Sequence, residues 1–137
     1  MPHETILVVE DDQFLADAYE AEFKKHNYTV VFARDGVEAL EILEKNIPDL
    51  VILDLIMPKK NGVEVLQELS KKGVVKKVPV VVASNLDKPG IEEECTALGA
   101  RGFFIKSNIT MSDILEKCRV LMQQGSKQKN RSEKRFK

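Results

Sequence analysis

Cysteine and histidine are scarce in this sequence of 137 residues, with two of each. Cys95 and Cys118 lie too far apart to form a metal or redox motif, and both fall in helix-like segments. We therefore expect buried free thiols, as in a reducing compartment. His3 and His26 have no partner residues nearby in sequence and are interpreted as surface residues. Nothing here indicates a disulfide framework or a histidine or thiolate metal site.

Long apolar runs are also missing. No run approaches the roughly 20 residues that span a membrane, and the first residues lack the basic region and apolar core of a secretion signal. We therefore expect a cytoplasmic, soluble protein with no membrane partner. The chain length and the apolar content of 43% fit one domain with a single core.

Charge is divided unevenly along the chain. The formal net charge is −1, but residues 126–137 carry six Lys/Arg against one Glu, so the other 125 residues sum to −6. This end is poor in apolar residues, and we expect a domain over residues 1–123 and a basic, disordered tail over residues 124–137. The tail could contact phosphates or an acidic partner protein. It lacks interleaved aromatics and a folded reading element, so specific DNA binding is not expected.

Short apolar runs alternate with helical patterns along the chain. The runs are nearly continuous, as expected for strands of a parallel sheet that is covered on both faces. They cover residues 6–9, 30–33, 50–53, 80–83 and 103–105. Helical spacing of apolar residues follows Asp12, Gly36 and Gly62, covers 90–98, and resumes from Thr110 or Ser112. These five βα units predict an α/β fold with an open, doubly wound parallel sheet.

Carboxylates follow two of these strands directly. Glu10, Asp11 and Asp12 come after the first run, and Asp54 comes after the third. An unpaired carboxylate is costly to bury, and hard cations such as Mg²⁺ are bound by carboxylates together with phosphate oxygens. Because ligands bind at the carboxyl ends of parallel strands, Asp11 and Asp54 are expected at the same rim. The pattern predicts a Mg²⁺ and phosphoryl site.

The fourth and fifth strands end at Ser84 and Lys106, which adds a hydroxyl and an ammonium group to the same rim. For the acidic cluster the alternative is helix capping, which we expect of Asp12. For Asp54 the alternative is a turn residue before Pro58. The convergence of four strands that are far apart in sequence favours a functional site.

The sequence resembles the receiver domain of bacterial two-component response regulators over about residues 4–123. The resemblance rests on four segments in the order and spacing of the family. They are Leu7 to Asp12, Asp54 to Pro58 with Gly62, Val82 to Asn85, and Phe103 to Lys106. It implies a CheY-like, flavodoxin-like sheet with the strand order 2-1-3-4-5 and five helices.

The resemblance also implies a chemical role for the acidic residues. Asp54 would be the phosphoacceptor, and the donor would be a phosphohistidine of a sensor histidine kinase or of a phosphotransfer protein. Asp11 would bind Mg²⁺ together with Asp54 and the backbone carbonyl of Ile56, and Glu10 would hold a metal-bound water. Phosphoryl transfer needs positioning and charge neutralisation more than a protein acid or base.

The same resemblance implies a switch. Ser84 and Lys106 would contact the phosphoryl oxygens and draw the loop after the fourth strand inward, and Phe103 would follow as an aromatic switch residue. Packing in the core is the alternative role of Phe103, and it can hold both roles. The output surface is expected on the fourth helix, fifth strand and fifth helix. Whether phosphorylation drives a homodimer through the fifth helix is left open.

The sequence departs from the family pattern at three positions. Ser107 stands where relatives usually have a proline after a cis bond, so we expect a trans Lys106–Ser107 peptide and a rearranged loop, with Lys106 still reaching the site. Ile56 and Leu86 occupy positions that tune the access of water to the phosphoryl group. Because apolar side chains cannot position water, we expect a long-lived phosphoryl-aspartate.

These residues predict a stand-alone phosphoacceptor receiver that signals through contact with an unidentified downstream protein and is not an enzyme. One alternative is a receiver-like interaction module that acts without phosphorylation, which Ser107 favours slightly. Another is a Mg²⁺-dependent phosphohydrolase, which would need an acid beside Asp54 for the leaving group. The sequence Asp54-Leu55-Ile56 offers none.

Overall fold

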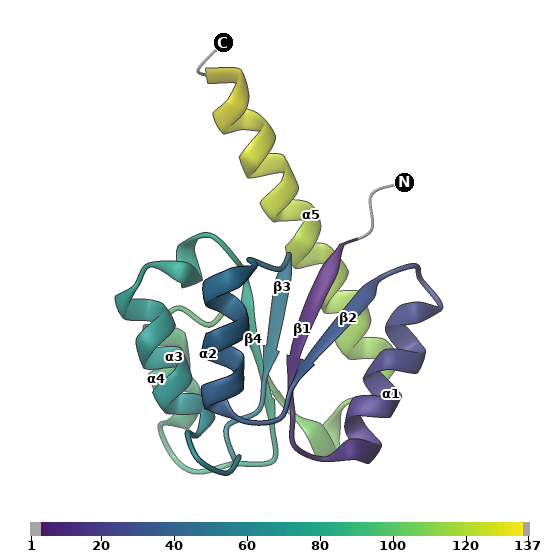
Figure 1. Cartoon of the computed structure of the whole chain (residues 1–137), viewed down its shortest axis with the longest axis vertical. Helices are drawn as coiled ribbons and strands as arrows, with labels where there is room; N and C mark the ends of the chain where they lie inside the picture. The colour runs from purple at the N-terminus through teal and green to yellow at the C-terminus, as the bar shows by residue number, and fades with distance from the viewer. Residues whose placement is uncertain (1–3, 136–137) are drawn as a thin grey trace.

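The computed structural model describes the backbone of residues 4–135 and the side chains of residues 4–124 (Figure 1). Its centre is a sheet of five parallel strands in the order β2-β1-β3-β4-β5. The strands are β1 (Thr5–Val9), β2 (Thr29–Ala33), β3 (Leu50–Leu53), β4 (Val80–Ser84) and β5 (Gly102–Ile105). The predicted α/β class and the flavodoxin-like strand order are confirmed.

Five α-helices alternate with the strands, as predicted. They are α1 (Gln13–Lys24), α2 (Gly36–Lys45), α3 (Gly62–Lys71), α4 (Ile91–Ala97) and α5 (Met111–Arg135). Asp12, Asp35 and Asn61 precede α1, α2 and α3, and the side chain of each accepts a hydrogen bond from a backbone N–H in the first turn of its helix. These bonds satisfy donors that have no partner within the helix. The capping role expected of Asp12 is therefore observed.

The helices cover the sheet in two layers, with α1 and α5 on one face and α2, α3 and α4 on the other (Figure 1). Side chains alternate between the layers along each strand. In β1, Leu7 and Val9 pack toward α2 and α3, whereas Ile6 and Val8 pack toward α1 and α5. The nearly continuous apolar strands of the sequence follow from this double cover. Cys95 and Cys118 are buried and free, one in each layer, as expected.

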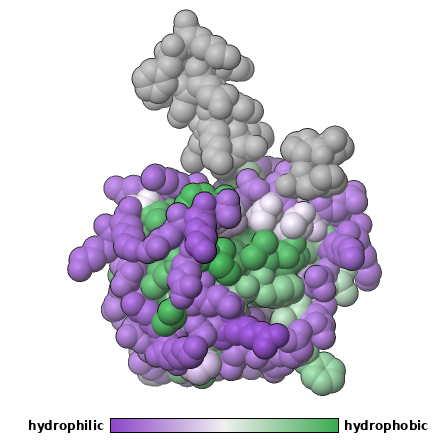
Figure 2. Space-filling model, in the orientation of Figure 1, coloured by the Kyte–Doolittle hydropathy of each residue, from purple (hydrophilic) through white to green (hydrophobic). Residues whose placement is uncertain are grey.

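Polar side chains dominate the surface in Figure 2, with an apolar strip beside α2. Within the described residues, no helix is both long enough and apolar enough to cross a membrane. Two short 3-10 helices complete the fold, η1 (Val74–Lys76) and η2 (Lys106–Asn108). The second one contains Ser107, and the described peptide bonds, including Lys106–Ser107, are trans as expected.

The last helix continues past the predicted end of the domain at residue 123 and is described to Arg135. The expected basic tail, residues 124–137, falls mostly on this extension. Side chains after residue 124 lie outside the described part of the chain. Disorder of the tail stays a prediction.

The loop between β3 and α3 passes close to the first residue of α3. A Cβ atom at Gly62 would lie 2.1 Å from the backbone oxygen of Asp54 and 2.7 Å from the Cα atom of Leu55. The Gly62 N–H also donates to the Leu55 carbonyl over 3.0 Å. A side chain at position 62 would therefore displace the backbone that carries Asp54.

Candidate functional site

The acidic residues lie where two neighbouring strands end. Strands β1 and β3 are paired as far as Val9 and Leu53, and Glu10 and Asp54 are the next residues of each strand. Each of the two is held by one further backbone bond. The Asp54 N–H donates to the Val9 carbonyl over 3.1 Å, and the Glu10 N–H donates to the Ala33 carbonyl over 2.9 Å. The sheet thus fixes the backbone from which both carboxylates project.

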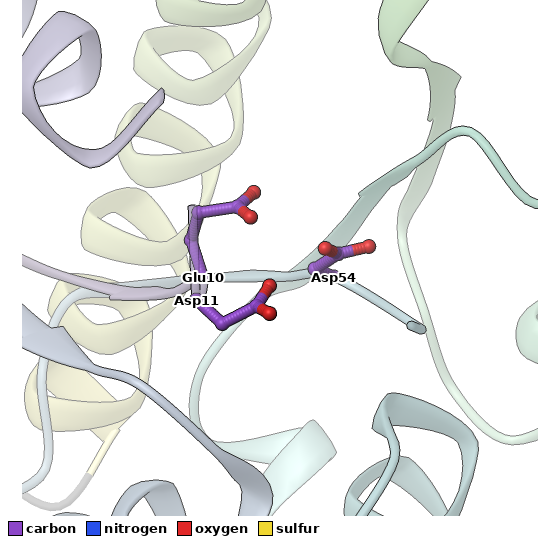
Figure 3. A group of neighbouring side chains, drawn as sticks. All are labelled: Glu10, Asp11 and Asp54. Carbon is purple, nitrogen blue, oxygen red and sulfur yellow. The ribbon is translucent and has the colours of Figure 1, made fainter. Parts of the chain in front are cut away.

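Three carboxylates gather at this rim. Glu10, Asp11 and Asp54 each place a carboxylate oxygen within 4.8 Å of the other two. Figure 3 shows that Glu10 and Asp11 extend toward the side on which Asp54 lies. Glu10 and Asp54 are only 4% and 5% exposed, whereas Asp11 is exposed. Buried and exposed carboxylates together form a site that opens to solvent on one side.

Lys106 joins the two buried carboxylates. Its Nζ atom lies 2.5 Å from Oε1 of Glu10 and 3.1 Å from Oδ2 of Asp54. The Lys106 side chain is only 12% exposed. The sequence-based expectation that Lys106 reaches the site despite Ser107 is therefore met. η2 begins at Lys106 itself, so the turn that contains Ser107 starts at the residue that carries the ammonium group.

The charges set the protonation of this cluster. Burial lowers the pKa of Lys106, but its hydrogen bond to Glu10 and the charge of Asp54 outweigh burial and raise the pKa above its usual value. The ammonium group is therefore charged at neutral pH. Burial raises the pKa of Glu10, against the hydrogen bond from Lys106, which lowers it.

A divalent cation fits this set of side chains. Three carboxylates against one ammonium leave a formal charge of −2, and the three acids offer oxygen ligands within reach of one another. Oxygen is the ligand atom that Mg²⁺ prefers. The metal-binding roles expected of Glu10, Asp11, Asp54 and the Ile56 carbonyl stay predictions.

Backbone N–H groups orient the buried acids. Oε2 of Glu10 accepts a bond from the Asp12 N–H over 3.1 Å, and Oδ1 of Asp54 accepts one from the Ile56 N–H over 3.3 Å. Ile56 itself is 57% exposed, so its apolar side chain stands at the open side of the loop after Asp54.

Ser84 lies on β4, the strand next to β3, and Phe103 lies on β5, the strand next to β4. Ser84 is fully buried at the end of β4, and its Oγ atom accepts a hydrogen bond from the Leu86 N–H over 3.2 Å. Phe103 in β5 is half-buried and packs against the core that faces α2, α3 and α4. It also lines a cavity of about 350 Å³ at the start of α4, where Ile91 is another lining residue. The contact of Ser84 with a phosphoryl group and the movement of Phe103 stay predictions.

Sequence reasoning gave no role to Asn85. In the structure its Oδ1 atom accepts a hydrogen bond from the Ser107 N–H over 3.0 Å, which ties the loop after β4 to η2. The sequence shows only the donor of this bond: Ser107 stands where relatives usually have proline, and a residue other than proline has the backbone N–H that the bond needs. Its partner could not be identified from sequence, since the two residues are 22 positions apart.

Comparison with known proteins places the chain in a family. The family model for the response regulator receiver domain matches residues 6–119. The response regulator MprA of Mycobacterium sp. (strain KMS) is 31% identical over 122 residues, which cover 88% of this chain and 51% of MprA. This chain thus spans about half the length of that relative.

Solved structures show the same likeness. The response regulator domain of Thermotoga maritima CheB is 30% identical, with a TM-score of 0.77 over 89% of this chain and 98% of that one. A CheY-like receiver domain protein from Methanospirillum hungatei JF-1 shares the fold, with a TM-score of 0.85 at 21% identity over 93% of this chain and 99% of that one. Together with the family match, these likenesses show that this chain belongs to the response regulator receiver domain family, whose members take part in two-component signalling with histidine kinases and downstream effectors.

Proposed function

We propose that Asp54 accepts a phosphoryl group from a phosphohistidine, on a sensor histidine kinase or a phosphotransfer protein, and that the chain thereby acts as a switch in a phosphorelay. The contact of Lys106 with Asp54 carries this proposal. A buried ammonium group 3.1 Å from a buried carboxylate oxygen places a positive charge where the phosphoryl oxygens would arrive. The family match supports the proposal, because phosphorylation is standard among receiver domains.

The transfer asks little of the protein as an acid or a base. An oxygen of the Asp54 carboxylate forms a bond to phosphorus while the bond from phosphorus to the donor histidine nitrogen breaks, and the electron pair of that bond stays on the imidazole. The protein contributes alignment and charge. The Ile56 N–H, 3.3 Å from Oδ1 of Asp54, holds the nucleophile in one orientation. Lys106 shifts from the carboxylates toward the developing charge on the phosphoryl oxygens.

The site residues also fit a Mg²⁺ ion. Asp11 and Asp54 would bind it directly, with the backbone carbonyl of Ile56, and Glu10 would hold one of its waters. The ion would supply positive charge against the phosphoryl oxygens. Lys106 adds one further charge, which the pairing with Glu10 and Asp54 already holds in place.

Phosphorylation would then change which proteins the chain binds. The phosphoryl group adds negative charge and acceptor oxygens near Ser84 and Lys106, and movement of Ser84 pulls on the loop after β4. The cavity beside Phe103 gives that ring space to move. We propose α4, β5 and α5 as the output surface, for a downstream protein or for a second copy of the chain. Action without an attached output domain stays a prediction, since MprA is about twice as long.

We further propose that the chain is a phosphoacceptor and does not turn over phosphate esters. A phosphohydrolase that works through an aspartyl phosphate needs an acid to protonate the leaving group. Ile56, two residues after Asp54, has no proton to give. Slow loss of the phosphoryl group to water is the only turnover that we expect.

Amide chemical shifts test this function. Wild-type protein and an Asp54→Asn control are each titrated with Mg²⁺ and then with acetyl phosphate or beryllofluoride. After acetyl phosphate or beryllofluoride is added, we expect the amide signals around Ser84 and Phe103 to shift in the wild type. The same signals are expected to stay in place in the Asp54→Asn control. If both proteins stay unchanged, the proposal fails and an interaction module that acts without phosphorylation becomes the better description.

A further inference from the structure

A side-chain hydrogen bond continues the link between β4 and β5 beyond the sheet. The two strands are paired as far as Ser84 and Ile105. Asn85 follows Ser84 directly, and Ser107 lies two residues after Ile105. Oδ1 of Asn85 accepts a hydrogen bond from the Ser107 N–H over 3.0 Å. The loop after β4 and the turn η2 are therefore joined at the point where both leave the ladder.

This bond fixes the backbone on the far side of Lys106. Ile105, before it, is held in the ladder with β4, and Ser107, after it, is held by Asn85. The Lys106 side chain thus projects from backbone that is tied on both sides. Because a lysine loses much rotamer freedom when its ammonium group is fixed, a tied backbone favours the observed contact with Asp54.

We infer that Asn85 is a positioning residue that acts through the Ser107 N–H to place Lys106, and that it couples Lys106 to the loop after β4. The inference rests on the phosphoryl transfer proposed above. Asn85 follows Ser84 directly, so a displacement of Ser84 toward a phosphoryl group also displaces the acceptor that holds Ser107. Lys106 and the loop after β4 then respond to phosphorylation together.

The coupling depends on the residue at position 107 in this chain. A proline there has no N–H, so Asn85 would have nothing to accept. A serine and an alanine supply the same N–H, which makes Ser107→Ala a matched control for Ser107→Pro. Asn85 and Ser107 are both exposed, so substitutions at these positions leave the core intact.

The rate of phosphorylation by acetyl phosphate at saturating Mg²⁺ tests the inference. Asn85→Ala is expected to lower the rate constant about three- to tenfold, the range for loss of one ordinary hydrogen bond. Asn85→Asp keeps an acceptor oxygen and is expected to restore most of the rate, and Ser107→Ala is expected to leave it unchanged. In a Ser107→Pro background, Asn85→Ala should have no further effect.

Equal rates for wild type and Asn85→Ala would overturn the inference. So would an undiminished effect of Asn85→Ala in the Ser107→Pro background, because Asn85 would then act by another route. A merely structural role of Asn85 predicts neither the rescue by Asp nor the loss of effect when the N–H at position 107 is removed.

A second readout needs no phosphorylation. Without any donor, Asn85→Ala is expected to speed hydrogen exchange of the Ser107 amide and to shift the NMR signal of the Lys106 ammonium group, whereas Ser107→Ala is expected to shift neither markedly. An unchanged Lys106 signal in Asn85→Ala overturns the inference. If the wild type takes no label from acetyl phosphate, the proposed function fails, and the Lys106 signal still decides the role of Asn85.

Discussion

Removal of the Lys106 ammonium group should destabilise the fold in a pH-dependent way. The carboxylates of Glu10 and Asp54 are only 4% and 5% exposed, and in Lys106→Met they lose ammonium contacts of 2.5 and 3.1 Å. At these distances each contact is an attraction of about 5 to 7 kcal/mol at an effective dielectric constant of about 20, most of which offsets the cost of burying the charges. Removing one partner of a buried pair typically costs about 3 to 5 kcal/mol.

Protonation of Glu10 limits this cost. Burial raises the pKa of Glu10, and the hydrogen bond from Lys106 opposes that shift, so the substitution raises the pKa further. The pKa of such an acid is higher in the folded state than in the unfolded state. Its contribution to stability is fully present below the pKa of the unfolded state and is lost as the pH rises through the pKa of the folded state. We therefore expect a loss of about 2 to 4 kcal/mol near neutral pH, and of only about 1 kcal/mol near pH 4.

Urea unfolding in metal-free buffer at both pH values measures these free energies. The matched control is Lys72→Met, because Lys72 also contacts two carboxylates, those of Glu44 and Glu68, at 3.8 and 3.6 Å, but its side chain is 51% exposed. A surface pair of this kind is worth about 0 to 1 kcal/mol, with little pH contrast. Equal losses for the two variants, or a Lys106→Met loss that does not shrink at low pH, would refute the electrostatic reasoning.

Three further outcomes follow from the structure. Gly62→Ala puts a methyl group 2.1 Å from the Asp54 backbone oxygen, so it should lower the free energy of unfolding by about 2 kcal/mol or more and slow phosphorylation, as urea unfolding and acetyl phosphate labelling would show. The phosphoryl group on Asp54 should persist for minutes or longer beside the apolar Ile56, and a half-life of seconds in the isolated protein would count against that. Cys95 and Cys118 should react with a thiol reagent only after unfolding, because burial raises the pKa of both, that of Cys118 to about 12; rapid labelling of the native protein near pH 8 would contradict this.

The fold could be predicted from sequence because its signals are local. Strand β1 appears as an apolar run, and α1 begins after the capping residue Asp12, so each element follows from short-range patterns. Alternation of strands and helices then leaves few arrangements of a parallel sheet. The strand order came from resemblance, since periodicity alone does not fix it.

The candidate site was only partly accessible from sequence. The rule that ligands bind where parallel strands end brought Asp11 and Asp54 together in advance. The pairing of Lys106 with Glu10 was not foreseen, because a side-chain contact over 96 positions leaves no local pattern. The bond from Ser107 to Asn85 was missed for the same reason.

Transfer of label from radioactive acetyl phosphate tests the central claim most directly. Wild-type protein and Asp54→Asn are incubated with Mg²⁺ or with a chelator, and the bound label is then challenged with hydroxylamine, which cleaves acyl phosphates. We predict Mg²⁺-dependent, hydroxylamine-sensitive label on the wild type and none on Asp54→Asn. Absence of label on the wild type, or equal label on both proteins, would contradict the assignment of Asp54 as the phosphoacceptor.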